Sequence, residues 1–221
     1  MFNDISGKYD FLNHFLSFGI DFSWRRKLVN QLSLYKPHRI LDVATGTCDL
    51  ALLISTLEPE HITGIDIAGN MLAIAKQKAG QKRLQERITF EEGDAEDLPF
   101  PDEVFDAVTV AFGVRNFEDL ERGLSEMRRV MKTGGVMMIL EFSHPSSFPW
   151  KHLYGFYSKH LVPFIGKMVS RNTQAYTYLP ESVSAFPSGK DFLEILEKAE
   201  MRNVSQHILT FGVATIYTGE K

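Results

Sequence analysis

The sequence predicts an α/β fold with a mostly parallel sheet that is covered by helices on both faces. Strand-like apolar runs alternate with helix-like segments between Ile40 and Leu140, as expected for such a sheet. A tight turn at Gly46 follows the first run, and the second run ends in the carboxylate of Asp66. The chain has 221 residues, 44% of them hydrophobic, which is enough for one domain of this class.

The order of the elements follows from the same periodicity. We expect strands at 39–43, 61–66, 88–93, 104–111 and 135–142, and helices at 50–57, 71–85 and 120–130. A further helix at 191–199 precedes two strands, 205–209 and 213–219, which Phe211 and Gly212 join. This ending predicts a hairpin, so that the sheet has an antiparallel last strand.

We expect one domain over residues 1–221, because no flexible linker or internal repeat interrupts the chain. Within it, the sequence predicts an N-terminal helical cap (1–36) and a ligand-binding core (37–144). A lid over the substrate (145–187) and a C-terminal helix with the strand hairpin (188–221) complete the chain.

The turn after the first strand lacks the common phosphate-binding patterns. A dinucleotide site needs G-x-G-x-x-G, whereas only Gly46 is present here, and no Gly-Lys-Ser/Thr follows. Two acids, Asp42 and Asp49, bracket the turn, although Asp49 is equally suited to cap a helix. Together with Asp66 they favour a ligand that carries positive charge, such as the sulfonium of S-adenosylmethionine.

Other polar residues follow the later strands, where a ligand of an open parallel sheet binds. Asp66 lies about 20 residues beyond the turn and is placed to accept hydrogen bonds from both ribose hydroxyls. Asp94 can accept from an exocyclic amine while the Ala95 amide donates to a ring nitrogen, a pattern that suits adenine. Each of these acids can instead close a turn or cap a helix.

Composition excludes several classes of partner and location. A net charge of -4 and a pI near 6.0 argue against nucleic acid as a general partner. The single cysteine, Cys48, cannot form an internal disulfide, and the N-terminal residues lack the pattern of a signal peptide. We therefore expect a cytoplasmic protein. No apolar run of about 18 residues is present, so we expect no membrane span. We also expect no metal site.

The stretch 142–180 stands apart because it contains no Asp or Glu but is rich in aromatic residues and basic side chains, among them Lys151, Lys159 and Lys167. One interpretation is a helical lid packed on the core, or the surface of a homodimer. The other is a basic, apolar mouth that meets an anionic membrane surface and admits a polyprenyl tail.

Two long segments resemble a known family. They are YDFLNHFLSFGIDFSWR at 9–25 and RVMKTGGVMMILEFS at 129–143, with shorter similar segments at 112–116 and 178–189. The chain is similar to the class I S-adenosylmethionine-dependent methyltransferases, which have a Rossmann-like seven-stranded sheet. More narrowly, it resembles the ubiquinone/menaquinone biosynthesis C-methyltransferase family over nearly its whole length.

The resemblance implies a cofactor, S-adenosyl-L-methionine, and a polyprenyl quinol as substrate. By position, the family's cofactor contacts fall on Thr47, Asp66, Asp94 and Ala95, beside the Asp42 and Gly46 of the turn. Cys48 replaces a glycine that is usual in the superfamily, and its side chain is expected to narrow the room beside the cofactor. Asp21 stands where the family usually has histidine.

The implied reaction is methylation of a ring carbon of demethylmenaquinol to give menaquinol. Alternatives are methylation of a polyprenyl methoxy-benzoquinol in ubiquinone biosynthesis, or a non-catalytic cofactor-binding scaffold.

The difficult part of this chemistry is charge on the phenolic oxygen, whose ordinary pKa is about 10. We expect Arg115 to stabilise that charge and Asn116 to orient the ring oxygen, although Arg115 can also serve only as the partner of a neighbouring acid. Glu141 and His144 are candidates to accept a proton. Tyr9 and Asp10 are candidates to close over the site.

Overall fold

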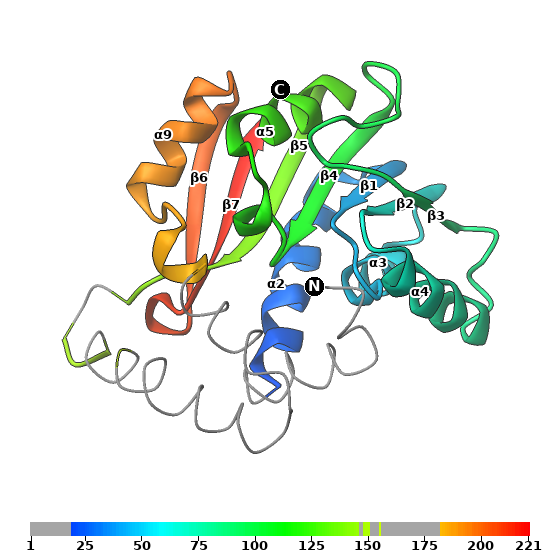
Figure 1. The fold of residues 1–221 in the computed structure, drawn as a ribbon, viewed down its shortest axis with the longest axis horizontal. Helices are drawn as coiled ribbons and strands as arrows, with labels where there is room; N and C mark the ends of the chain where they lie inside the picture. The colour runs from blue at the N-terminus through cyan, green and yellow to red at the C-terminus, as the bar shows by residue number, and fades with distance from the viewer. Residues whose placement is uncertain (1–18, 146–147, 151–154, 156–181) are drawn as a thin grey trace.

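The computed structural model describes residues 19–145, 148–150, 155 and 182–221 (Figure 1). Its centre is a seven-stranded sheet in the order β3-β2-β1-β4-β5-β7-β6. The strands are β1 (Arg39–Val43), β2 (His61–Asp66), β3 (Ile88–Glu92), β4 (Phe105–Ala111), β5 (Met131–Phe142), β6 (Arg202–Leu209) and β7 (Ala214–Glu220). The first five strands pair in parallel, whereas β7 is antiparallel to both β5 and β6. The predicted mostly parallel sheet with an antiparallel last strand is therefore confirmed.

Helices and several short 3₁₀ turns flank these strands, and those below have complete bounds within the described residues. The helices are α2 (Ile20–Leu32), α3 (Asp49–Ile54), α4 (Gly69–Gln81), α5 (Leu120–Val130) and α9 (Lys190–Lys198). The 3₁₀ turns are η1 (Ser33–Tyr35), η2 (Ser55–Leu57), η3 (Val114–Asn116) and η5 (Thr210–Gly212). At the start of α5 the Asp119 side chain accepts a hydrogen bond from the Arg122 amide, at 3.0 Å, and so caps the helix as its residue type favours.

The sheet separates two apolar cores because successive side chains of a strand point to opposite faces. On β1, Ile40 joins the core formed with α2, α3 and α4, whereas Leu41 joins the core formed with α5 and α9. On β5, Met138 and Met137 divide in the same way. Helices thus cover both faces, as expected.

Burial along the strands agrees with their order in the sheet. In β1 every residue after Arg39 is buried, which fits a central strand covered on both faces. The edge strands β3 and β6 are mostly exposed or half-buried, and their polar residues face water. In Figure 1 these edge strands lie at opposite ends of the sheet.

The structure departs from the sequence-based bounds by three or more residues at four elements. One is the helix expected at 50–57: α3 ends at Ile54, and the 3₁₀ turn η2 follows it. β5 begins at Met131, four residues earlier than expected, and pairs with β4 through an irregular register between Phe105 and Ala107. β6 begins at Arg202 instead of 205, because an exposed edge strand tolerates polar residues that conceal its pattern. α4 ends at Gln81 instead of 85, where Arg83 adopts a left-handed backbone (φ 58°).

Two predicted segments lie mainly outside the described residues. They are the first half of the N-terminal cap, with Tyr9 and Asp10, and most of the lid at 145–187, with Lys151, Lys159 and Lys167. Among the helices of the described ranges, none is both long and apolar enough to cross a bilayer.

Candidate active site

A groove lies at the carboxyl ends of β1 and β4, where the topology of the sheet reverses direction. From β1 the chain builds β2 and β3 outward on one side, then returns to place β4 on the other side of β1. This switch point is where open parallel sheets bind ligands. Two adjoining pockets form the groove and share four residues, which are Ala44, Asp66, Gly113 and Asn116.

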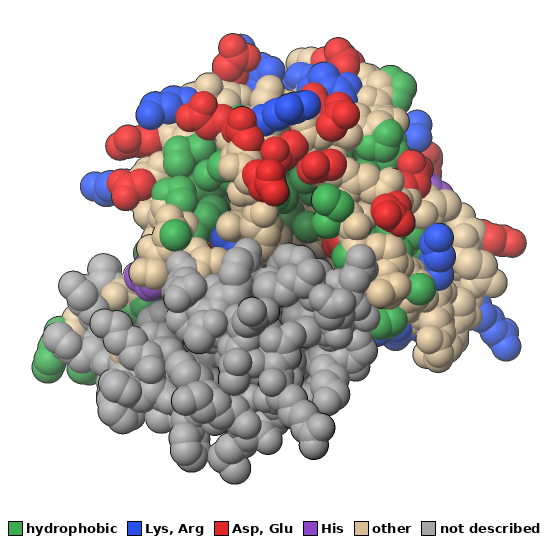
Figure 2. All heavy atoms as spheres, in the orientation of Figure 1, with side chains coloured by type: hydrophobic (Ala, Val, Ile, Leu, Met, Phe, Trp, Pro, Cys, Tyr) green, Lys and Arg blue, Asp and Glu red, His purple; other side chains and the backbone are tan. Residues whose placement is uncertain are grey.

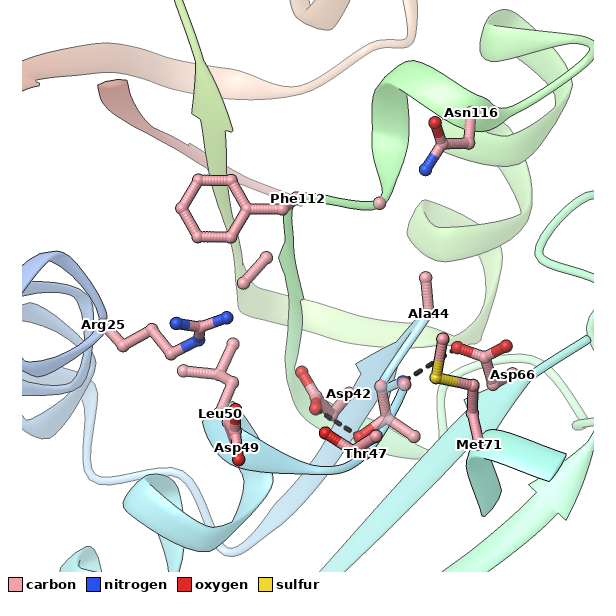
Figure 3. Close-up of a pocket in the computed structure, with 14 residues that line it drawn as sticks. Arg25, Asp42, Ala44, Thr47, Asp49, Leu50, Asp66, Met71, Phe112 and Asn116 are labelled. Atoms are coloured by element: carbon pink, nitrogen blue, oxygen red, sulfur yellow. Dashed lines mark hydrogen bonds between the residues drawn. The ribbon is translucent and has the colours of Figure 1, made fainter. Parts of the chain in front are cut away.

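The floor of the first pocket is the buried carboxyl group of Asp42 at the end of β1 (Figure 3). It accepts hydrogen bonds from the hydroxyls of Thr45, at 2.6 Å, and Thr109, at 2.8 Å. Burial raises the pKa of Asp42 to about 6, although these hydrogen bonds and the charge of Arg25 oppose the shift. When ionised, a carboxylate held in this way attracts a cation that enters the pocket.

The turn after β1 depends on a left-handed backbone at Gly46 (φ 55°). This conformation costs glycine little and turns the Gly46 amide toward β2, where it donates to Asp66 at 2.8 Å. Thr47 also lines the first pocket, and its hydroxyl accepts from Lys78 at 3.1 Å. The same lysine forms an ion pair with Asp49, at 2.8 Å. The predicted turn residues Asp42, Gly46 and Thr47 are therefore brought together.

The expectation that Cys48 narrows the space beside the cofactor is wrong. Its left-handed backbone (φ 68°) directs the side chain into the core, where Sγ contacts the carbonyl oxygen of Ala75 in α4 at 3.5 Å. Cys48 is fully buried and lines neither pocket of the groove.

Asp66 connects the two pockets. Its two carboxylate oxygens accept hydrogen bonds from the amides of Gly46 and Ala68, each at 2.8 Å. Burial raises the pKa of Asp66, and these backbone hydrogen bonds oppose the rise. A carboxylate has about four lone-pair positions, so Asp66 can still accept a hydrogen bond from a ligand hydroxyl.

The second pocket brings together the residues predicted to hold adenine. Asp94 and Ala95 line it with Phe117 and Ile67. The Asp94 carboxylate accepts from the Glu96 amide at 2.9 Å, which fixes its direction. Ile67 is 66% exposed at the edge of this pocket and offers apolar surface to a flat ring.

The structure separates the predicted catalytic residues. Asn116 lines both pockets, whereas Arg115, Glu141 and His144 line neither. Arg115 and Glu141 are buried and form an ion pair, at 2.8 Å, between η3 and β5. The same guanidinium donates to the carbonyl oxygen of Phe112, so it braces the turn that carries Asn116.

His144 is exposed on the loop after β5, and its Nε2 lies 3.0 Å from the carbonyl oxygen of Val183.

Several groove residues were not predicted from the sequence as site residues. They include Arg25, Ala44, Thr45, Leu50, Met71, Phe112 and Gly113 in the first pocket, with Ile67 and Phe117 in the second. Arg25 reaches the groove from α2, the helix that contacts α3 and β5. The sequence did offer one indication of a role for Arg25, because it lies in the segment 9–25 that resembles the family.

Comparisons with known proteins agree with this geometry. The model of the ubiE/COQ5 methyltransferase family matches residues 1–221. The demethylmenaquinone methyltransferase of Bacteroides fragilis is 47% identical, with 100% of this chain and 91% of the relative covered. The ubiquinone/menaquinone biosynthesis C-methyltransferase UbiE of Geotalea daltonii is 48% identical over 100% of this chain and 94% of the relative.

Among solved structures, a SAM-dependent methyltransferase from Aquifex aeolicus superimposes with a TM-score of 0.60 at 19% identity, covering 82% of this chain and 81% of that one. This likeness confirms the predicted class I methyltransferase fold. With the family model matched from end to end, this chain belongs to the ubiE/COQ5 methyltransferase family.

Proposed function

We propose that this protein transfers a methyl group from S-adenosylmethionine to a ring carbon of demethylmenaquinol and so forms menaquinol. The observation that carries the proposal is full-length similarity, at 46–47% identity, to proteins named as demethylmenaquinone methyltransferases. The groove supports it, because an acidic floor at a switch point suits a cationic cofactor without phosphate groups.

The residues of the groove fit S-adenosylmethionine in order along its length. We assign adenine to Asp94 and the Ala95 amide, beside the apolar surface of Ile67, and the ribose hydroxyls to Asp66. The sulfonium end then falls in the first pocket, near Thr47 and Asp42. Bound there, the cofactor supplies an electrophilic methyl group.

On the protein side, we assign contact with the quinol oxygen to Asn116. It lines both pockets, and its amide can donate to an oxygen that gains negative charge. Because Glu141 balances the charge of Arg115, we assign Arg115 to positioning the turn that presents Asn116. Because the Glu141 side chain is buried against Arg115 and lines neither pocket, we propose no proton transfer to it.

Alignment of the two reactants is the larger contribution we infer for the protein. Holding the reacting atoms in line supplies about 7–11 kcal/mol in favourable cases. A positioned general base supplies roughly 10²- to 10⁴-fold, or about 3–5 kcal/mol. The rigid frame of the groove, built on strand ends and buried hydrogen bonds, is consistent with catalysis by positioning.

A methyl-transfer assay tests the proposal. The purified protein is supplied with labelled S-adenosylmethionine and either reduced short-tail demethylmenaquinol or the matching methoxy-benzoquinol, and mass spectrometry identifies the methylated carbon. Turnover of the naphthoquinol is the expected result. Cofactor binding without turnover of either quinol would reject the proposal and favour the scaffold alternative.

Turnover of both quinols would make the enzyme dual. Relatives named for both quinones at 47–48% identity are the observation that favours this second candidate.

A split of kinetic constants separates the roles of Asn116 and Arg115. Asn116→Ala removes the proposed contact, so kcat is expected to fall about 10²- to 10³-fold, as when an oxyanion donor is lost. Arg115→Lys keeps the charge opposite Glu141 and is expected to retain more of kcat. Equal losses in both variants would contradict the division.

We also propose peripheral contact with the cytoplasmic face of a membrane, since the proposed substrate carries a lipid tail. An exposed aromatic patch supports this: Phe148 is 83% and Phe211 58% exposed, and Trp150 stacks on Phe211 with ring centroids 3.8 Å apart. Large exposed aromatic residues of this kind suit the interface of a bilayer.

Vesicle co-sedimentation tests the patch. The double variant Phe148→Ser with Phe211→Ser is expected to lose binding to vesicles with anionic lipid. Leu34→Ser is the matched control, because Leu34 is 78% exposed on η1. Unchanged vesicle binding in the double variant would reject the contact, and loss of self-association instead would identify a homodimer surface.

A further inference from the structure

Arg25 is a buried cation at one end of the groove. Arg25 is 8% exposed and lines the first pocket together with Asp42 and Leu50. In Figure 3 its guanidinium points from α2 toward the pocket, at the opposite end from Asp66. The charge of Arg25 also reaches Asp42, whose pKa it lowers against the effect of burial. A guanidinium so far from water requires anionic partners.

One of those partners is Asp21, one helical turn earlier on α2. Its carboxylate accepts a hydrogen bond from Nη1 of Arg25, and both side chains are buried. The guanidinium has five N–H donors in a fixed fork, so one bond leaves most of them for other partners. Its Nε is buried and has no hydrogen-bond partner among the described residues. A buried donor of this kind is costly unless a ligand satisfies it.

The position of Arg25 is fixed by its surroundings. Its guanidinium carbon lies 5.2 Å from the centre of the Phe112 ring, in a cation–π arrangement. The neighbouring Trp24 packs near Phe112 and Phe142, with ring centroids 6.1 Å away in each case. Its Nε1 donates to the Thr210 hydroxyl at 2.8 Å. A charge held on a packed helix is ready to bind without a large cost in side-chain entropy.

The direction of the cofactor indicates which group meets Arg25. This step rests on the placement proposed above, with adenine at Asp94 and ribose at Asp66. Beyond the ribose and the sulfonium, the cofactor ends in an amino acid group with a carboxylate and an ammonium. A cation at the far end of the first pocket matches the carboxylate, whereas the nearby Asp42 matches positive charge.

We propose that Arg25 binds the α-carboxylate of S-adenosylmethionine and that Asp21 orients the Arg25 fork for this contact. Arg25 thereby determines selectivity for a ligand with an intact amino acid end. Asp21 occupies a position where a histidine is usual in the family, so this chain supplies a full negative charge to hold the arginine.

Calorimetric binding of two ligands tests the proposal without measuring turnover. One ligand is S-adenosylmethionine, and the other is decarboxylated S-adenosylmethionine, which keeps the sulfonium and the amine. A hydrogen-bonded charge pair corresponds to a preference of about 10- to 100-fold. The wild-type protein is therefore expected to bind the intact cofactor more tightly by that factor, and a ratio near one would overturn the proposal.

Variants then assign the preference to Arg25. In Arg25→Gln the affinity for S-adenosylmethionine is expected to fall about 10- to 100-fold, while the affinity for the decarboxylated ligand stays within about 3-fold. Arg25→Lys keeps the charge and is expected to retain part of the preference. Arg26→Gln is the matched control, because Arg26 is the exposed neighbour on the same helix, and it should keep the full preference.

Two outcomes would overturn the assignment. One is an equal loss for both ligands in Arg25→Gln, which indicates a general effect on the pocket. The other is an unchanged preference in a folded Arg25→Gln protein. If Arg25→Gln does not fold, loss of part of the preference in Arg25→Lys supports the assignment, and full preference there rejects it. A failure here leaves the proposed methyl transfer intact, because turnover is measured separately.

Discussion

Replacing Asp42 with asparagine is expected to stabilise the protein above neutral pH. Asp42 is 1% exposed, and burial raises its pKa from the ordinary 3.8 to about 6. A carboxyl group whose pKa is higher in the folded state binds its proton more tightly there than in the unfolded chain. Its ionisation therefore costs stability, and the cost grows as the pH rises from about 4 to about 6 and is complete above that.

The shift of about two pKa units corresponds to about 3 kcal/mol at pH 8, at 1.36 kcal/mol per unit. At pH 5 about half of that cost remains. The asparagine amide fits the same shape, because its oxygen can accept from one threonine hydroxyl and its nitrogen can donate to the other after that hydroxyl rotates. The free energy of unfolding of Asp42→Asn should thus exceed that of the wild-type protein by up to about 3 kcal/mol at pH 8 and by about half as much at pH 5.

Urea unfolding of both proteins at pH 8 and pH 5 measures the difference. Asp106→Asn is a control of opposite sign: the Asp106 carboxyl is partly buried, yet its bonds to Lys132 and two backbone amides hold its pKa below the ordinary value. That variant should lose more stability at pH 8 than at low pH. A stability difference for Asp42→Asn that does not change with pH would refute the reasoning.

Three further predictions concern the groove and its supports. Asp66→Ala removes the acceptor of two backbone amides and is expected to lower stability by about 1–3 kcal/mol in urea unfolding and to weaken cofactor binding at least about 10-fold in calorimetry; unchanged affinity would exclude the ribose contact. Gly64→Ala places a Cβ 2.9 Å from an aromatic ring and from a threonine methyl and should cost about 1–3 kcal/mol. Gly80→Ala, on α4 with nothing within 4 Å, should gain up to about 1 kcal/mol, so equal effects of the two would contradict the packing argument. Arg115→Ala leaves Glu141 buried without its cation and should cost about 3–5 kcal/mol by thermal or urea unfolding; a cost below about 1 kcal/mol would show that the pair is not buried as described.

The central strands could be predicted closely because a parallel strand covered on both faces is a nearly continuous apolar run. The bounds of β1 and β2 agree residue for residue with the sequence-based ranges. α5 also begins and ends as expected, since Asp119 is a good N-cap before an amphipathic segment. The start of β6 was missed because its exposed residues lack that pattern.

The sequence by itself determined the fold class, the family and the strand-end residues Asp42, Asp66, Asp94 and Asn116, since each lies next to an apolar strand in the chain. Only the tertiary structure decided which groups meet at the carboxyl ends of the strands. Arg25 enters the groove because α2 packs against β5 and α3, and the Arg115–Glu141 pair forms because β4 and β5 lie side by side in parallel. Side-chain direction was likewise a tertiary property at Cys48, where the left-handed backbone turns the thiol into the core. Local periodicity records burial, but contacts between distant segments depend on packing that periodicity does not encode.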